Sequence, residues 1–305
     1  EEVRVDFQRW LVVDGTLAGF ANFGEADAVA YLLHPTDRTT GLSYSLLPMI
    51  HAILSGLFTA EQARHHLGLI EQHLLGPDGA RLFDRPLAYR GGLQRFFQRA
   101  ESSSFFGREI GLMYTHAHLR YAEALWQYGD ADGFFRALCQ SVPIALDTHV
   151  PAATRRQANC YYSSSDAAFA DRYHAYAEYD RALAGEVPLD GGWRVYSSGA
   201  GIATALIFRC FLGLRLEPSR LVIDPAIPKR LDGLRAELEL GGMRFEITYR
   251  IEANGCGVRA LELNGRDLPF LRRHHPYRSG GAEVSMAALQ ENTTERPIRL
   301  TVWLA

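Results

Sequence analysis

The run Leu221-Val222-Ile223-Asp224-Pro225, a few residues after Arg215, marks where the sequence changes from helix-like to strand-like. A short apolar run that ends at a proline is typical of a strand. Five more segments predict strands, from alternating apolar and polar side chains or from short apolar runs between turn residues. They are residues 234–240, 244–251, 258–263, 283–286 and 298–304. We therefore expect residues 216–305 to form an antiparallel β-sandwich.

Upstream of Arg215, apolar residues recur at helical spacing, so residues 1–215 are expected to be mainly helical. The predicted helices are residues 45–55, 59–75, 119–128, 132–141, 166–184 and 201–212. Thr59 and Gln62 have the spacing of a capping box at a helix start. Residues 1–5, in contrast, resemble a strand.

Long polar segments join these helices, over residues 75–105, 144–165 and 186–199. Loops of that length in a compact domain usually carry function. Paired helices whose ends and loops line a central pocket form a toroid, whereas a solenoid would show a repeat of fixed period. The sequence thus predicts an α+β protein with a helical domain over residues 1–215 and the β-sandwich over residues 216–305.

Composition bounds the function. The hydrophobic content of 47% supports a large core, and a net charge of -3 gives no basic surface for nucleic acid. No apolar run reaches the roughly 18 residues of a membrane span. A leader for secretion is not visible, so we expect a cytoplasmic protein without a membrane span.

Cysteines and histidine pairs give no sign of a metal site. The cysteines lie far apart without a C-x-x-C pair, so we expect reduced, structural thiols. They are Cys139, Cys160, Cys210 and Cys256. The pairs His65-His66 and His274-His275 have no partner at ligand spacing, and we expect both pairs to be exposed.

A basic residue, a carboxylate and two histidines lie within twelve positions, just ahead of the helix predicted from residue 119. The segment is Gly107-Arg108-Glu109-Ile110-Gly111-Leu112-Met113-Tyr114-Thr115-His116-Ala117-His118. Arg and His donate charge-assisted hydrogen bonds to oxyanions such as phosphate. The alternative is that the two histidines make structural hydrogen bonds at a helix start.

Two further segments combine small hydroxyl residues with glycine or aromatic residues. The first is Gly191-Gly192-Trp193-Arg194-Val195-Tyr196-Ser197-Ser198-Gly199-Ala200-Gly201. Its hydroxyls and main-chain amides suit phosphate, or Ser198 caps an ordinary helix. The second is Asn159-Cys160-Tyr161-Tyr162-Ser163-Ser164-Ser165-Asp166. Aromatic rings beside hydroxyls suit sugar recognition, while Asp166 is equally suited to cap the helix that follows.

These segments resemble those of the carbohydrate phosphorylases of glycoside hydrolase family 94. The family includes cellobiose phosphorylase, β-1,2-oligoglucan phosphorylase and the C-terminal part of cyclic β-1,2-glucan synthase. In the relatives, a phosphate-binding histidine opens a helix and a Gly-Asp turn follows thirteen residues later, as Gly129-Asp130 follows His116. Their sugar-binding basic and acidic pair ends seven residues before the histidine, as Arg108-Glu109 does.

The resemblance implies a fold and a set of site residues. The fold would be the C-terminal part of an (α/α)6 helical barrel over residues 1–215, followed by the β-sandwich. Serines here replace the threonine of the family's phosphate-binding turn. The implied phosphate-binding residues are His116, Ser197, Ser198 and Gly199. The residues expected at the sugar are Arg108, Glu109, His118, Tyr162, Ser163 and Asp166, although His118 has no assigned family role.

The family cleaves β-glucosidic bonds with phosphate and inverts the anomeric carbon, giving α-glucose 1-phosphate. Phosphate is itself an anionic nucleophile, so one protein carboxyl, a general acid, is sufficient. The family supplies this acid as an Asp in a Trp/Asp-rich segment upstream of the histidine, and the chain contains no such string. We therefore expect a C-terminal portion that lacks the general acid and is inactive alone.

The resemblance implies a glycosyltransferase of the phosphorylase type that uses a β-glucan oligosaccharide and inorganic phosphate. It implies no metal and no organic cofactor, and it leaves open whether the protein is a homodimer. Three alternatives stay open at this point. They are the phosphorylase-like end of a cyclic glucan synthase, a hydrolase on the same helical toroid, and a non-catalytic glucan-binding module.

Overall fold

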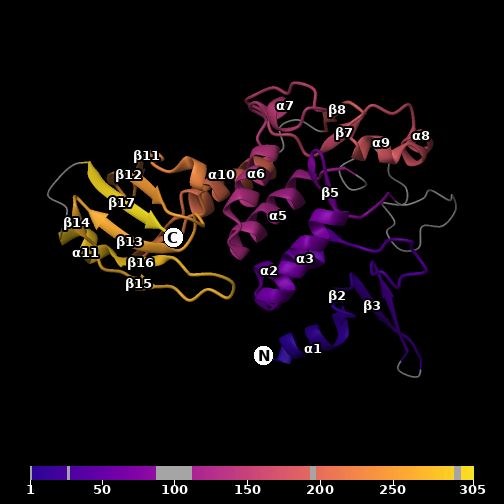
Figure 1. Ribbon diagram of the computed structural model, residues 1–305, viewed down its shortest axis with the longest axis horizontal. Helices are drawn as coiled ribbons and strands as arrows, with labels where there is room; N and C mark the ends of the chain where they lie inside the picture. The colour runs from indigo at the N-terminus through magenta and orange to yellow at the C-terminus, as the bar shows by residue number, and fades with distance from the viewer. Residues whose placement is uncertain (1, 26–27, 87–111, 193–196, 292–296) are drawn as a thin grey trace. The chain divides into compact units, whose positions relative to one another are not determined.

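The computed structural model describes residues 2–25, 28–86, 112–192, 197–291 and 297–305. The chain divides into two compact units, and Figure 1 labels many of their helices and strands. Unit 1 comprises Glu1–Ala124 and Ala137–Ala203, and unit 2 comprises Leu125–Arg136 and Thr204–Ala305. The division lies near the boundary expected after residue 215, but two helical stretches before that residue belong to unit 2.

Unit 1 begins with helix α1 (Glu2–Leu11), so the expectation of a strand over residues 1–5 is wrong. Side-chain contacts explain the helix. The rings of Phe7 and Trp10, three residues apart and hence on one helix face, contact Phe58 and Phe23 at centroid distances of 5.8 and 5.3 Å.

Helices α2 (Leu46–Leu54) and α3 (Ala60–His73) confirm two of the predicted helices. The capping box at α3 is also confirmed. Thr59 accepts the main-chain N–H of Gln62 at 3.2 Å, and the Gln62 side chain accepts the Thr59 N–H at 3.0 Å. These two bonds satisfy donors that a helix start would otherwise leave without partners.

Four two-stranded sheets among the described residues of unit 1 were not predicted, because strands of two to four residues show no clear alternation. The first two pairs are β1 (Val12–Val13) with β2 (Thr16–Leu17), and β3 (Phe20–Phe23) with β4 (Val29–Leu32). The others are β5 (Leu75–Gly76) with β6 (Gly79–Ala80), and β7 (Ser165–Ala167) with β8 (Leu189–Gly191).

The helices predicted around residues 119–141 are confirmed as α5 (Thr115–Tyr128) and α6 (Ala131–Ser141). The division between the units falls within both of them. A short helix, α7 (Leu146–His149), follows. Helix α10 (Ser197–Leu206) continues into a π-helical turn, η2 (Ile207–Phe211), and these two cover most of the helix predicted over residues 201–212.

The single helix expected over residues 166–184 is wrong. Asp166 lies in β7, and the helices are α8 (Arg172–Ala177) and α9 (Tyr179–Leu183). Asp171, not Asp166, is the N-cap, and its carboxylate accepts the main-chain N–H groups of the second and third residues that follow at 2.9 and 2.8 Å. Pairing of β7 with β8 therefore prevails over the helical pattern at the start of this segment.

Unit 2 contains two sheets that share one apolar core. The four-stranded sheet has the order β15 (Leu271–Arg272), β16 (Ala282–Ser285), β10 (Arg220–Ile223), β9 (Leu214–Glu217). The five-stranded sheet has the order β11 (Arg235–Leu240), β12 (Met243–Ile251), β17 (Ile298–Leu304), β13 (Val258–Leu263), β14 (Arg266–Asp267). Turn η3 (Lys229–Leu231) and helix α11 (Met286–Glu291) complete the unit.

One pairing departs from the expected antiparallel sandwich, because β17 runs parallel to β12. The cause is the strand order. Consecutive strands β12 and β13 run in opposite directions, and the last strand, β17, lies between them. A strand in that position must be parallel to one neighbour and antiparallel to the other, and β17 is antiparallel to β13.

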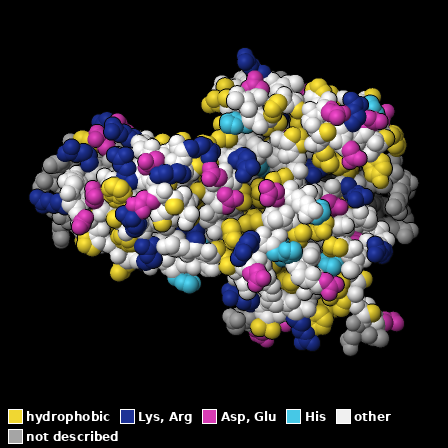
Figure 2. Space-filling view, viewed as in Figure 1, with side chains coloured by type: hydrophobic (Ala, Val, Ile, Leu, Met, Phe, Trp, Pro, Cys, Tyr) yellow, Lys and Arg dark blue, Asp and Glu magenta, His cyan; other side chains and the backbone are white. Residues whose placement is uncertain are grey.

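Other expectations from composition have mixed outcomes. The four cysteines form no disulfide, and three of them are buried. Within the described ranges, no helix has the length and apolar character to cross a membrane. On the face drawn in Figure 2, Lys and Arg side chains are interspersed with Asp and Glu rather than gathered in one basic area.

His66, expected to be exposed, is fully buried in α3. Its Nε2 accepts the main-chain N–H of Leu17 at 3.0 Å, and its Nδ1 donates to the carbonyl of Gln62 at 2.7 Å. The ring also stacks on Phe58. Burial is the main reason that the pKa of His66 is lowered to about 4, and the hydrogen bond from Leu17 needs the neutral ring.

Unit 1 should therefore lose stability in mild acid. The folded pKa of His66 lies below its unfolded value of about 6.5, so its contribution is complete above pH 6.5 and is lost as the pH falls toward 4. The loss should be about 3 kcal/mol in the free energy of unfolding by pH 4. Chemical denaturation of the chain at several pH values measures it. His149→Gln, at an exposed position in α7, is the control and should keep the same profile. Titration of the His66 ring near pH 6.5 would contradict the assignment.

Candidate functional site

The start of α5 is fixed to a distant segment of unit 1. The main-chain N–H of Thr115 donates to the carbonyl of Ser163 at 2.9 Å, and the Thr115 hydroxyl donates to the carbonyl of Tyr162 at 2.7 Å. The next N–H groups of a helix start have no partner within the helix and form the positive end of its dipole. A long helix with its start held in this way can bind an anion there.

His116 lies in this first turn and is half-buried. Its ring nitrogens form no hydrogen bond with any residue in the described parts of the chain. The ring lies beside that of Tyr114, at a centroid distance of 6.1 Å. Burial lowers the pKa of His116, and the charges of Arg120 and His51 act in the same direction. The imidazole is therefore mainly neutral near pH 7, with both nitrogens available to a ligand.

Main-chain hydrogen bonds bring three sequence-distant segments of unit 1 together. The N–H of Ser165 donates to the carbonyl of Met113 at 2.9 Å, and the N–H of Gly192 donates to the carbonyl of Ser164 at 2.8 Å. In the β7–β8 pair, Ser165 lies opposite Gly191. The histidine segment, the serine segment and the glycine segment predicted from the sequence are thus neighbours.

Two glycines allow this close approach. A β-carbon on Gly191 would lie 2.1 Å from a ring carbon of Tyr162, and one on Gly192 would lie 2.3 Å from the hydroxyl oxygen of Ser164. Neither distance is possible for real atoms. The Gly-Gly pair is therefore required for the aromatic ring and the serine hydroxyls to pack against this strand.

The three serines of this segment are buried, and the hydroxyl of one of them has no described partner. The side chains of Ser163, Ser164 and Ser165 are at most 2% exposed. The hydroxyls of Ser163 and Ser164 are 3.5 Å apart, at the limit of a hydrogen bond. The Ser165 hydroxyl has no hydrogen-bond partner among the described residues. A buried polar atom without a partner is uncommon and indicates a bound water or ligand.

Arg156 was missed by the sequence interpretation. Its guanidinium lies over the ring of Tyr162, 5.2 Å from the centroid, and its Nη2 donates to the carbonyl of Asp190 at 3.0 Å. Its Nε is buried without a partner among the described residues. Burial lowers the pKa of Arg156, but the side chain stays protonated. The only signal was the Arg155-Arg156 pair shortly before the aromatic and serine segment.

Asp166 is half-buried in β7, directly opposite Asp190 in β8. Burial raises the pKa of its carboxyl, and the charge of Asp190 raises it further, against a hydrogen bond from the N–H of Ala167. A carboxyl of this kind can accept a hydrogen bond from a sugar hydroxyl or, when it is protonated, donate one to it.

His118 cannot contact a ligand in this structure, which corrects its expected place at the sugar. Its side chain is fully buried. Nδ1 accepts the main-chain N–H of Ala80 at 3.0 Å, and Nε2 donates to the carbonyl of Ala137 at 2.7 Å. Both ring nitrogens are therefore satisfied within the protein, which is the structural alternative that the sequence left open.

The remaining predicted site residues are only partly described. Arg108 and Glu109 lie outside the described residues. Ser197 begins α10, although its side chain is not described, and within that first turn Ser198 is exposed and Gly199 is buried. No described contact joins Ser198 to His116. In the described ranges there is no cluster of three His, Cys, Asp or Glu side chains that could hold a metal ion.

Comparison with known proteins identifies relatives. The chain is 37% identical over 303 residues to a 1,2-beta-oligoglucan phosphorylase of Listeria innocua, covering 99% of this chain and 27% of the relative. It is 26% identical over 213 residues to a cellobionic acid phosphorylase of Neurospora crassa, covering 67% of this chain and 24% of the relative. No family model matches the chain. The chain thus spans about a quarter of the length of each of these relatives.

Proposed function

We propose that the chain carries the phosphate side of a glycoside phosphorylase site, because almost its whole length is similar to part of a 1,2-beta-oligoglucan phosphorylase. The proposed reaction is phosphorolysis of a β-linked gluco-oligosaccharide to α-glucose 1-phosphate. The observation that carries the proposal is the convergence of the His116 helix start with the serine and Gly-Gly segments.

The phosphate would lie at the start of α5. His116 would donate one hydrogen bond from its ring, and main-chain N–H groups of the first turn would donate others along the helix dipole. The start of α10, with Ser197, Ser198 and Gly199, would close the phosphate site from the other side. Inorganic phosphate is then the co-substrate, and the proposed chemistry requires neither a metal nor an organic cofactor.

The sugar would lie beside the phosphate, near the aromatic and serine segment. The half-buried Tyr162 offers a ring edge, and Asp166 offers an acceptor with a raised pKa. The partnerless Ser165 hydroxyl and Arg156 Nε would both gain partners from sugar hydroxyls. Arg108, Glu109 and Ser163 stay predictions for the same subsite.

In the proposed inverting step, a phosphate oxygen attacks the anomeric carbon while the glucosidic bond to the leaving oxygen breaks. A general acid gives its proton to that oxygen. We propose that this acid lies in the part of the relatives that the chain does not match, which is nearly three quarters of their length. We propose further that α2, α3, α5, α6 and α10 belong to an (α/α)6 barrel, as the family resemblance implies.

The test is the identity of the product. The complete gene product that contains this chain should convert a β-1,2-linked gluco-oligosaccharide and phosphate into α-glucose 1-phosphate, with equimolar loss of phosphate. Proton NMR distinguishes the α-anomer of the ester from free glucose. Phosphate-independent release of glucose would indicate a hydrolase, and glucan binding with no turnover would indicate a binding module. Either result would overturn the proposal.

A further inference from the structure

Arg215, in strand β9 of unit 2, is a half-buried arginine without a partner. It makes no hydrogen bond and no ion pair with any residue in the described ranges, and its Nε is shielded from solvent. Burial lowers its pKa, yet an arginine side chain stays protonated. A partly buried positive charge with no directly bonded counter-charge is unfavourable. The site therefore needs an explanation.

The sheet register identifies the acids that share a face with Arg215. Arg215 lies opposite Val222 in β10, and Val222 lies opposite Glu283 in β16. Residues directly opposite each other project from the same face of a sheet, as do residues two apart along a strand. The acids on this face are thus Glu283 and, two residues after Arg215, Glu217.

Both acids are already paired with other arginines. Glu217 lies 3.3 Å from Arg220 and 3.0 Å from Arg273. Glu283 lies 2.6 Å from Arg220 and 3.5 Å from Arg273. Neither carboxylate reaches Arg215 with an ion pair.

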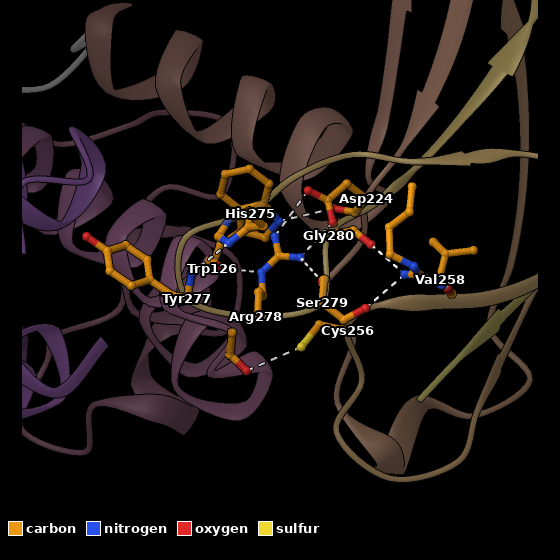
Figure 3. Close-up of polar contacts among 11 residues, drawn as sticks. Trp126, Asp224, Cys256, Val258, His275, Tyr277, Arg278, Ser279 and Gly280 are labelled. Carbon is orange, nitrogen blue, oxygen red and sulfur yellow. Dashed lines mark hydrogen bonds and ion pairs between the residues drawn. The ribbon is translucent and has the colours of Figure 1, made fainter. Parts of the chain in front are cut away.

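The third acid near Arg215, Asp224, is fully used elsewhere (Figure 3). Its two carboxylate oxygens accept from Nη1 and Nη2 of Arg278 at 2.7 and 3.2 Å. The guanidinium of Arg278 lies over the ring of Trp126, whose indole N–H donates to the Asp224 carbonyl at 3.1 Å. Asp224 therefore attracts Arg215 only at a distance, because both of its oxygens are bonded to Arg278.

The local charge balance is positive. Two arginines lie close enough to lower the pKa of Arg215: Arg273, and Arg209 in η2. Arg209 has no ion pair among the described residues. Four arginines (209, 215, 220 and 273) face two glutamates (217 and 283), which leaves two positive charges on this part of unit 2.

We propose that Arg215, together with Arg209 and Arg273, forms an oxyanion site in unit 2 that binds a phosphate group. The ligand is either inorganic phosphate or a phosphate ester. A phosphate group carries between one and two negative charges near pH 7, which matches the excess better than the single charge of a carboxylate. The planar guanidinium fork also fits its oxygens. All three arginines belong to unit 2, so the proposal does not depend on the one made for His116 in unit 1.

The test uses the whole chain and follows the Nε–H resonance of Arg215 by NMR. Inorganic phosphate and α-glucose 1-phosphate are titrated in parallel at constant ionic strength, with glucose as a neutral control. The resonance should shift and saturate with at least one of the two phosphates. Arg215→Gln and, separately, Arg209→Gln should weaken that binding at least about tenfold. Arg266→Gln, which removes an exposed charge from β14, should not change it.

Thermal unfolding separates binding from folding. Without phosphate, Arg215→Gln should leave Tm unchanged or raise it, because the variant removes a charge without a partner. Phosphate should raise Tm of the wild type more than that of the variant.

An unchanged Nε resonance, or full phosphate affinity in Arg215→Gln, would overturn the proposal. His116→Ala changes no residue of the arginine site. If phosphate binding is lost in His116→Ala but kept in Arg215→Gln, the phosphate lies at His116 and the arginine site is overturned.

Discussion

Replacement of His116 by alanine should weaken phosphate binding about 10- to 100-fold and leave the affinity for β-glucan almost unchanged. The ring has no hydrogen bond to any described residue, so its loss removes a ligand contact and little structure. In the complete gene product, the effect should appear as a raised KM for phosphate. His149→Ala, at an exposed position in α7, is the control. Equal losses for phosphate and glucan would argue against a phosphate contact.

The protonation of His116 gives a second readout of the same contact. Burial, with the charges of Arg120 and His51, holds the pKa of the vacant imidazole below its ordinary value. A bound phosphate dianion would favour the protonated ring, so phosphate binding near pH 7 should take up protons. Calorimetric titration in buffers with different ionisation enthalpies measures this uptake. Phosphate itself can exchange protons near pH 7, so His116→Ala is the matched comparison. Equal proton uptake in the wild type and in this variant would argue against the contact.

Replacement of Gly213 by alanine should reduce the stability of unit 2 by about 4 kcal/mol or more. Gly213 connects η2 to β9 with a φ of +69°, a region that is unfavourable for residues with a β-carbon. An added β-carbon would also lie 2.1 Å from the nitrogen of Pro225 and 2.5 Å from the carbonyl carbon of Asp224. Both are main-chain atoms, so no side chain can rotate away. Denaturant unfolding of the chain measures the change.

Gly265 provides the matched control for this prediction. It has a similar φ of +78°, but an added β-carbon would meet no atom within 4 Å. Gly265→Ala should therefore show only the backbone strain, about 1–2 kcal/mol. If Gly213→Ala reduced the free energy of unfolding no more than Gly265→Ala did, the close approach of the two main-chain segments would not be a determinant of the fold.

Local sequence patterns correctly predicted the elements that are determined by residues close together in the sequence. The capping box of α3 and the alternation in β11 and β12 are formed by neighbours in sequence, and these elements lie close to their predicted bounds. Predictions were wrong where distant contacts decide. Strand β7 forms because β8 pairs with it, and β17 is parallel to β12 because it lies between two earlier strands.

The same distinction applies to the candidate site. Its three segments were recognisable from residue types and from the family resemblance, and main-chain hydrogen bonds in unit 1 join them. The roles of single side chains depend on burial, which has no reliable local pattern. His116 and His118 are two residues apart, yet one has open ring nitrogens and the other is fully bonded within the protein. Arg156 became visible only through its contact with Tyr162.

The most direct test of the phosphate site is a crystal structure of the protein soaked with phosphate and with its close analogue, vanadate. The proposed site predicts an anion within hydrogen-bond distance of the His116 ring and of main-chain N–H groups at the start of α5. Ser198 and Gly199 should border the same cavity. A structure in which His116 and Ser198 face separate regions, with no anion beside the imidazole, would contradict the phosphate role.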